Sequence, residues 1–174
     1  MNKYRNIDYL QRGSKRQCIA YKELKELQLM EILQEYQPLL AGTIPLEIDI
    51  ETSDLDILCT CGNHVKFSKR LKRYFSHNKS FRIETKHIND IETTICRFQG
   101  NYFPIEIFGQ KKKSVEQDAF RHMLIEAQIL QEKGSIFAKE ITHLKKSGLK
   151  TEPAFAKLLG LKGNPYVALL NYKG

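Results

Sequence analysis

The chain has 174 residues, of which 41% are hydrophobic and 28% are charged. This composition supports one folded domain and excludes a disordered chain. The formal net charge of +8 favours an anionic partner such as a nucleic acid or a nucleotide polyphosphate, although a charged surface also serves solubility. The first residues show no signal-peptide pattern, and no apolar run approaches the ~18 residues of a membrane helix. We therefore expect a cytoplasmic protein with no membrane segment.

The part of the chain before Pro38 is predicted to be largely helical. Residues 5–12 fit a short helix. Residues 21–36 place Leu24 and Leu27 at helical spacing, and Pro38 ends this second helix.

Strand patterns follow. Residues 46–50 and 54–59 alternate between apolar and polar side chains with period two, which predicts two strands. Residues 65–75 fit a basic amphipathic helix with an exposed charged face, and residues 81–84 fit a strand.

A hairpin is predicted next. Its strands are residues 93–98 and 102–108, and Gln99, Gly100 and Asn101 supply the turn. Gly100 is expected to be the left-handed residue of that turn.

The remainder of the chain is predicted to be helical. One helix covers residues 115–132 and is closed by Gly134, and a second covers residues 135–146. A third opens at Thr151, and residues 165–172 form a short last helix. The order of helix, sheet and helices predicts an α+β fold in a single domain, residues 1–174.

Two carboxylates define the first candidate site. Asp54 and Asp56 are two residues apart on a predicted strand, so their side chains point to the same face. The opposite face carries Leu55, Ile57 and Cys59 and is expected to be buried against helices. Adjacent like charges are unfavourable unless a cation lies between them, and hard oxygen ligands suit Mg²⁺. A solvated sheet face is the alternative for an isolated pair of this kind.

Three further features favour a metal site over that alternative. Ser53 precedes the pair, and the Gly42-Thr43 turn lies upstream of it. Glu106 is the only acid in the apolar run 103–108, where an isolated carboxylate requires a partner or a metal. We predict that the three carboxylates converge on one point at the sheet surface.

Gly42-Thr43 followed by the segment SDLDI (residues 53–57) resembles the signature of the polymerase-beta-like nucleotidyltransferase superfamily. There a Gly-Ser turn precedes a D-x-D strand, and a later strand supplies a third acid. The wider pattern GTIP, SDLDI, FPIEIFGQ, TEPAFAKLLGL and NPY is similar to a bacterial nucleotidyltransferase-like family of unknown function. The resemblance implies a small mixed β-sheet with flanking helices over residues 36–113, and a C-terminal helical extension over residues 114–174.

The resemblance also implies chemistry. It implies transfer of a nucleotidyl group from an NTP to an unknown acceptor, which would be a protein, an RNA or a small molecule. Two Mg²⁺ ions, with Mn²⁺ as a substitute, would lie roughly 3.5–4 Å apart. The residues implied to bind them and to carry catalysis are Asp54, Asp56 and Glu106. The residues implied to contact the nucleotide phosphates are Gly42, Thr43 and Ser53. Lys111 is also predicted to contact phosphate, because it directly follows the strand that carries Glu106.

Two other functions fit the same fold. One is a catalytically inactive nucleotide- or RNA-binding protein, and the other is an antitoxin-like partner protein. The three carboxylates favour the enzyme, because a binding protein would not need them. His122 and Glu126 are four residues apart on one helix face. They would either reach the cleft as substrate contacts or form a surface or interhelical polar pair, and we expect the polar pair.

The cysteines offer no second metal site. Cys59 and Cys61 are followed by His64, but the paired Cys and His elements of a zinc site are missing. We expect four free thiols and no zinc, in keeping with the expected compartment.

Overall fold

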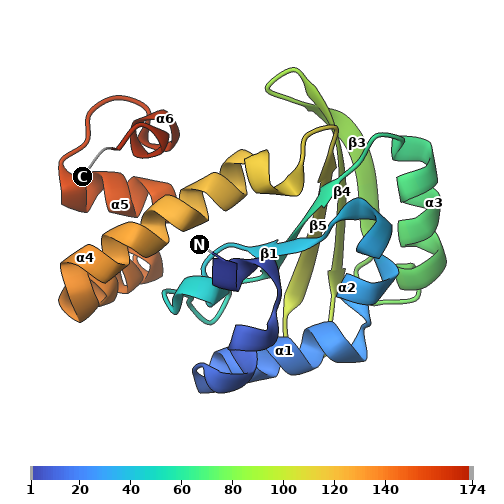
Figure 1. Cartoon of the computed structure of the whole chain (residues 1–174), viewed down its shortest axis with the longest axis horizontal. Coiled ribbons are helices and arrows are strands. Elements are labelled where there is room, and N and C mark those ends of the chain that lie inside the picture. The colour runs from blue at the N-terminus through green and yellow to red at the C-terminus, as the bar shows by residue number, and fades with distance from the viewer. Residues whose placement is uncertain (1, 173–174) are drawn as a thin grey trace.

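A five-stranded mixed sheet forms the centre of the computed structural model, which describes residues 2–172 (Figure 1). The spatial order is β1-β2-β5-β4-β3. The β2–β5 pair is parallel, and the other three neighbouring pairs are antiparallel. The predicted α+β fold with a small mixed sheet is confirmed. The strands are β1 (Leu39–Ala41), β2 (Leu55–Thr60), β3 (Arg82–Ile88), β4 (Ile91–Gln99) and β5 (Pro104–Gln110).

Helices cover both faces of the sheet (Figure 1). One face packs against α1, α2 and α3, and the other packs against the long helix α4, whose far end carries α5 and α6. The α-helices are α1 (Lys15–Glu26), α2 (Leu29–Ile32), α3 (His64–Phe75), α4 (Asp118–Lys146), α5 (Thr151–Leu159) and α6 (Pro165–Leu170). Short 3₁₀ helices cover Asn2–Arg5, Asp8–Arg12, Gln34–Tyr36, Ile44–Leu46 and Ser114–Glu116.

The strand β2 divides its side chains between two cores. Ile57 and Cys59 are fully buried in the cluster that contains α1 and α3. Leu58 points the other way and packs with Phe120 and Met123 of α4. The predicted placement of Cys59 against helices and away from Asp56 is confirmed, and all four cysteines are free thiols.

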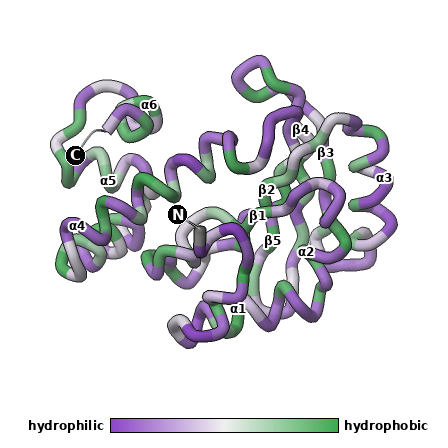
Figure 2. Tube along the Cα trace, viewed as in Figure 1, coloured by the Kyte–Doolittle hydropathy of each residue, from purple (hydrophilic) through white to green (hydrophobic). Residues whose placement is uncertain are grey.

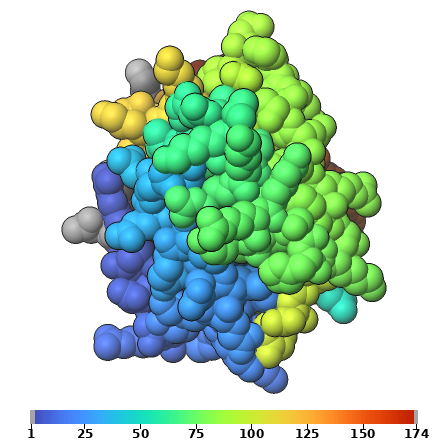
Figure 3. Space-filling view, turned by 90° about the vertical axis from the view of Figure 1, so that its right-hand side faces the viewer, coloured from blue at the N-terminus to red at the C-terminus, as the bar shows by residue number. Residues whose placement is uncertain are grey.

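Helix α3 shows the predicted amphipathic pattern. Phe67 and Leu71 are fully buried against the sheet. Hydrophilic and hydrophobic positions mix along the helix in Figure 2, and its outer surface lies open beside the β3–β4 hairpin in Figure 3. The exposed basic residues of this surface are Lys66, Lys69, Lys72 and Arg73.

The predicted single helix over residues 21–36 is wrong. Gln28 adopts a left-handed conformation (φ 49°) that separates α1 from α2. The break has a packing reason: Leu24, Leu29 and Leu33 are all fully buried, and a spacing of five residues between the first two does not keep them on one side of a continuous helix. Residues 5–12 hold parts of two 3₁₀ helices in place of one short α-helix.

The predicted strand over residues 46–50 is also wrong. Pro45 lies in the 3₁₀ helix Ile44–Leu46, and Glu47 turns left-handed after it. Ile48 then enters the core formed by α4, α5 and α6 instead of pairing in the sheet. The strand missing from the sequence analysis is β1, which pairs with β2 through Leu40 and Ile57.

The β3–β4 hairpin was predicted only in part. Its strands are longer than expected, and Asn89 and Asp90 form the turn with φ values of 48° and 61°. Both positive φ values match the two-residue turns that suit twisted hairpins. Polar, mostly exposed side chains along β3 obscured its period.

The C-terminal helices agree with prediction. Gly134 has non-helical angles (φ 77°, ψ −170°) and divides α4 into two helical segments, as expected for a helix closed at that residue. Both segments contribute to the core shared with α5 and α6, through Ile129 and Ile141. Within residues 2–172, no helix is both long enough and apolar enough to cross a membrane.

A buried carboxylate holds the turn between β4 and β5. Glu23 of α1 is fully buried and accepts hydrogen bonds from the backbone N–H groups of Asn101 (2.9 Å), Tyr102 (2.5 Å) and Phe103 (3.2 Å). The expected left-handed Gly100 is wrong, because its φ is not positive. Glycine is favoured there by close packing: an added Cβ would lie 2.7 Å from Glu23 Oε1.

We predict that Glu23→Ala destabilises the protein by about 3 kcal/mol or more, because it leaves one buried and two part-buried backbone donors without their acceptor. Chemical denaturation measures the change. Glu26→Ala is the control: Glu26 lies on the same helix with an exposed partner, Lys22, at 3.7 Å, and should change stability by less than about 0.5 kcal/mol. Equal losses in the two variants would contradict the assigned role of Glu23.

Candidate active site

A cavity of about 530 Å³ lies between the sheet and the C-terminal helices. Six of the seven residues predicted for the site line it, and they occupy the wall formed by β2, β5 and the loop before β2. These six are Gly42, Thr43, Ser53, Asp54, Asp56 and Glu106. The opposite wall, from α4, α5 and α6, includes His122, Glu126, Lys145, Lys150, Glu152 and Tyr166.

The strand register sets the positions of the carboxylates. Asp56 of β2 lies directly beside Glu106 of β5 in the parallel pair. Asp54 precedes Asp56 by two residues and also faces the cavity. Side chains in register on neighbouring strands share a face, so the sheet presents these carboxylates to one space.

Gly42 packs its backbone against one of these carboxylates. Its neighbour Ala41 is paired with Asp56 across β1 and β2. Gly42 has a φ of +81°, and an added Cβ would lie 2.3 Å from Asp56 Oδ2. A side chain at this position would displace the carboxylate, and glycine also permits the turn conformation.

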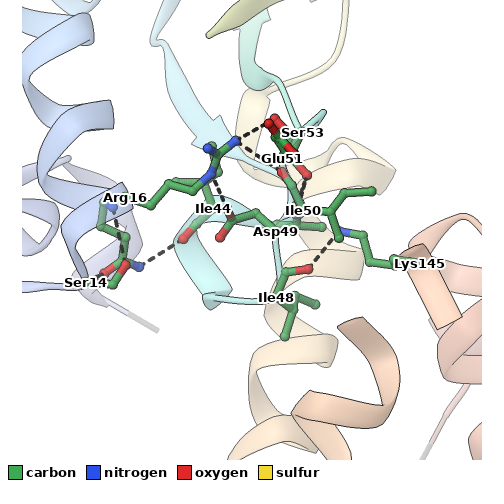
Figure 4. A network of polar contacts seen from close by, with 11 residues as sticks. Ser14, Arg16, Ile44, Ile48, Asp49, Ile50, Glu51, Ser53 and Lys145 are labelled. Atoms are coloured by element: carbon green, nitrogen blue, oxygen red, sulfur yellow. Dashed lines mark hydrogen bonds and ion pairs between the residues drawn. The ribbon is translucent and has the colours of Figure 1, made fainter. Parts of the chain in front are cut away.

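The loop between Gly42 and β2 is fixed by Arg16 of α1 (Figure 4). Its Nη2 donates hydrogen bonds to the carbonyl oxygens of Ile50 (3.1 Å) and Glu51 (3.0 Å), and its Nε forms an ion pair with Asp49. A guanidinium group binds several acceptors at once, so one side chain defines the path of the loop.

Hydroxyl groups and a lysine fix the two ends of the same loop. The Ser53 hydroxyl accepts a hydrogen bond from the backbone N–H of Ile50 (2.9 Å) and lies 3.4 Å from Thr43 Oγ1, which donates to it. Lys145 of α4 donates to the carbonyl oxygen of Ile48 at 2.9 Å (Figure 4). The loop is therefore bound to both α1 and α4.

Crowded negative charge dominates the electrostatics of the sheet wall. Burial raises the pKa of the Asp56 carboxyl to about 8, and the neighbouring carboxylates of Asp54, Glu106 and Glu152 raise it in the same direction. A carboxyl in this environment holds a proton at neutral pH unless a cation replaces the proton.

Glu106 has a cationic partner in the structure. Arg97 Nε lies 2.5 Å from Glu106 Oε2, and the same guanidinium group lies 3.3 Å from Glu84 Oε1. Arg97 and Glu106 are register partners on β4 and β5. This ion pair satisfies the isolated acid of the apolar strand.

The donor set suits a divalent cation in the type of its ligands but not in their present spacing. Within residues 2–172, no three His, Cys, Asp or Glu side chains lie close enough together to hold a metal ion. The oxygen ligands, their shared cavity and the proton retained by Asp56 nevertheless suit Mg²⁺. The residues fit Mg²⁺ in type and share one cavity, but their carboxyl groups do not converge on one point as predicted, and Glu106 would have to leave Arg97 to join the other two.

A family match covers most of the chain. The sequence model of a family described as a domain of unknown function, DUF4269, matches residues 22–172. The chain belongs to the DUF4269 family. No curated protein sequence matches it.

Solved structures that match the fold include a poly(U) polymerase and an RNA terminal U-transferase. A structure of the Cid1 poly(U) polymerase with MgGTP bound has a TM-score of 0.55 and 12% sequence identity, and the match covers 76% of the DUF4269 chain and 42% of Cid1. A second Cid1 structure, bound to Mg 3′-dATP, has a TM-score of 0.54 and 12% sequence identity, and the match covers 90% of the DUF4269 chain and 48% of Cid1. A cytoplasmic RNA terminal U-transferase has a TM-score of 0.51 and 12% sequence identity, and the match covers 76% of the DUF4269 chain and 39% of the transferase.

These matches establish the fold of the DUF4269 protein. It is that of the polymerase-beta-like nucleotidyltransferases, as the sequence resemblance implied. The chain spans less than half the length of these relatives, so the comparison concerns only part of each of them.

The seventh predicted residue is not brought to the cavity. Lys111 is exposed, follows the last residue of β5, and is not among the cavity-lining residues of the DUF4269 protein. The register explains its position: Gln110 pairs with Thr60, four residues along from the Asp56–Glu106 pair. Four strand residues separate these points by about 13 Å.

Several residues of the helical wall were missed or underrated. His122 and Glu126 are buried, line the cavity and do not pair with each other, so the expected surface or interhelical pair is wrong; His122 Nε2 lies 2.9 Å from the Tyr166 carbonyl oxygen instead. Lys145 is buried, and because lysine is seldom buried the sequence carried no signal that placed it in the cavity wall. For Glu152, the one signal was its place in the segment TEPAFAKLLGL, which resembles the related family.

The raised pKa of Asp56 gives a prediction for the metal-free protein. Its folded-state pKa of about 8 lies above the ordinary carboxyl value of about 4. The stability from the retained proton is therefore complete below pH 4 and is lost as pH rises through 8. Asn at position 56 cannot ionise, so the Tm of Asp56→Asn minus that of native protein should grow between pH 4 and 8 by several degrees, then level off.

Thermal melts in EDTA across this pH range measure the difference. A Tm difference that stays constant with pH would show that Asp56 ionises normally in the folded DUF4269 protein.

Proposed function

We propose that the DUF4269 protein is a Mg²⁺-dependent nucleotidyltransferase that moves a nucleotidyl group from an NTP to an acceptor. One observation carries the proposal: Asp56 and Glu106 are register partners on β2 and β5, and they face one cavity together with Asp54, Gly42 and Thr43. The likeness to Cid1 structures with MgGTP and Mg 3′-dATP bound supports it.

Each residue has a defined task in this proposal. Two Mg²⁺ ions, when bound, supply charge stabilisation for the attacking and leaving oxygens. Asp54 and Asp56 would hold both ions. Glu106 would ligate the ion on the side of the attacking hydroxyl and help to remove its proton. The backbone N–H groups of Gly42 and Thr43 would donate to the β- and γ-phosphates, because the absence of a Cβ at Gly42 allows close approach.

The overall reaction is a balanced exchange at phosphorus. The acceptor oxygen forms a bond to the α-phosphorus as the bond from that phosphorus to the bridging oxygen breaks. Pyrophosphate leaves, and the proton of the acceptor hydroxyl passes to Glu106 or to water. We also propose residues 36–113 as the nucleotidyltransferase core and residues 114–174 as the helical extension that closes the cavity.

One observation favours a second candidate, an inactive nucleotide- or RNA-binding protein of the same fold. Glu106 is ion-paired with Arg97, and the three carboxylates are not arranged around a metal position. A protein that retained the fold for binding alone would tolerate this arrangement.

We predict that Asp56→Asn abolishes Mg²⁺-dependent NTP binding while the fold remains intact. The substitution preserves shape and removes one negative charge from a site that must gather two dications. Native protein should melt several degrees higher with Mg²⁺ and an NTP, because a ligand that binds only the folded state stabilises it, whereas Asp56→Asn should show no shift. Thermal melts with each NTP, with and without Mg²⁺ or Mn²⁺, make the comparison.

Asp90→Asn is the matched control. It makes the same chemical change at the exposed tip of the β3–β4 hairpin and should keep the full shift. Activity is tested by incubating the protein with labelled NTPs, Mg²⁺ and cell extract. Mg²⁺-dependent NTP binding without a labelled acceptor, equal in native and Asp56→Asn protein, would favour the inactive binding protein.

A further inference from the structure

Glu126 is a buried carboxyl group without a partner. It lies on α4, is 3% exposed, and lines the cavity on the wall opposite the strands. Within residues 2–172, its carboxyl group has no hydrogen bond or ion pair to another side chain or to the backbone. A buried carboxyl group without a donor is unfavourable unless it keeps a proton or meets a cation.

A second carboxylate lies on the same wall. Glu152 of α5 also lines the cavity. Its negative charge raises the pKa of Glu126, as expected for like charges that lie close together. Neither carboxylate is a ligand in the proposed metal site, which is formed by Asp54, Asp56 and Glu106, although the charge of Glu152 also raises the pKa of Asp56.

Neither nearby base makes a hydrogen bond to these two carboxylates, although Lys145 lowers the pKa of Glu126 and His122 lies within ion-pair distance of Glu152. Lys145 Nζ donates to the carbonyl oxygen of Ile48, and burial lowers its pKa. The Tyr166 carbonyl oxygen can only accept, so His122 must carry a proton on Nε2. Its Nδ1 lies 3.8 Å from Glu152 Oε1, beyond hydrogen-bond distance.

We propose that Glu126 and Glu152 form a binding subsite for a primary ammonium group of the acceptor, across the cavity from Asp54, Asp56 and Glu106. Only the identification of the bound molecule as the acceptor rests on the proposed function. The subsite selects acceptors that carry an amine for recognition in addition to the hydroxyl that reacts.

The chemistry favours an amine over other cations. An ammonium group presents three N–H donors, which match two carboxylates on neighbouring helices. Mg²⁺ requires near-octahedral oxygen coordination and keeps several waters, for which two carboxylates on an otherwise mixed wall are a poor cage. The formal charge of +8 repels polyamines from the surface in general, so their binding would report a specific acidic site.

Calorimetric titration with 1,4-diaminobutane tests the subsite in metal-free protein, with 1,4-butanediol as the neutral probe of equal length. The diamine should bind and the diol should not. Glu126→Gln and Glu152→Gln should each weaken diamine binding roughly tenfold or more, as expected for loss of a charge-assisted hydrogen bond. Gln is close in shape, so melting temperatures of these variants should not fall.

Two control variants locate the binding. Glu132→Gln makes the same charge change at an exposed position of α4 and should retain diamine affinity within about twofold, since surface charges contribute little. Asp56→Asn should retain it as well. Absence of saturable binding at millimolar diamine, unchanged binding by Glu126→Gln, or a loss confined to Asp56→Asn would overturn the proposal.

Proton release provides a second readout. Burial and Glu152 raise the pKa of Glu126 to about 8, with Lys145 acting in the opposite direction and with His122 and Tyr166 beside them on the same wall. At pH 7 the ammonium group must displace a proton from Glu126, so the binding heat should depend on the ionisation enthalpy of the buffer in native protein. The Mg²⁺–NTP melts do not involve Glu126, so failure of the proposed function would leave the amine-binding subsite standing without its assignment to an acceptor, and failure of the subsite would leave the proposed function standing.

Discussion

Asp56 and Glu106 lie side by side because β2 and β5 pair in parallel with one fixed register. Alternation along both strands sends Ile57 and Ile107 into the core of α1 and α3 and leaves the carboxylates on the other face. A slip of one residue in this pairing would bury Glu106 among apolar side chains. The burial of the strands thus fixes the positions of the groups that we propose to be catalytic.

The same arrangement makes the resting site electrostatically unfavourable. The raised pKa of Asp56 means that this carboxyl group keeps a proton at neutral pH. Glu106 forms an ion pair with Arg97. Both responses are reversible, since a dication can replace a proton and can compete with a guanidinium group that is half exposed. Such local conflict with stability is typical of functional sites. The helical wall holds a second buried carboxyl group of this kind, Glu126, whose pKa is also raised to about 8 and which has no hydrogen bond or ion pair within residues 2–172.

The parts of the structure that follow short-range patterns could be predicted. The period of β2, the isolated Glu106 and the glycine turn gave six residues that line one cavity. The loop at residues 44–53 could not be predicted, because Arg16 and Lys145, far away in the sequence, decide its path. Gly100 was expected to adopt a left-handed backbone conformation. Glycine is instead needed there because a side chain would collide with the carboxylate of Glu23. Lys111 was placed near the site by sequence proximity, which strand direction overrides.

The central claim is that Asp54, Asp56 and Glu106 gather metal ions, and anomalous diffraction from crystals grown with Mn²⁺ and a non-hydrolysable NTP analogue tests it most directly. We predict anomalous peaks at coordination distance, about 2.0–2.3 Å, from carboxylate oxygens of Asp54 and Asp56, with Glu106 turned from Arg97 toward one of them. Nucleotide bound in the cavity with no anomalous peak near Asp56, or with Glu106 still paired to Arg97 and far from any metal, would contradict the account.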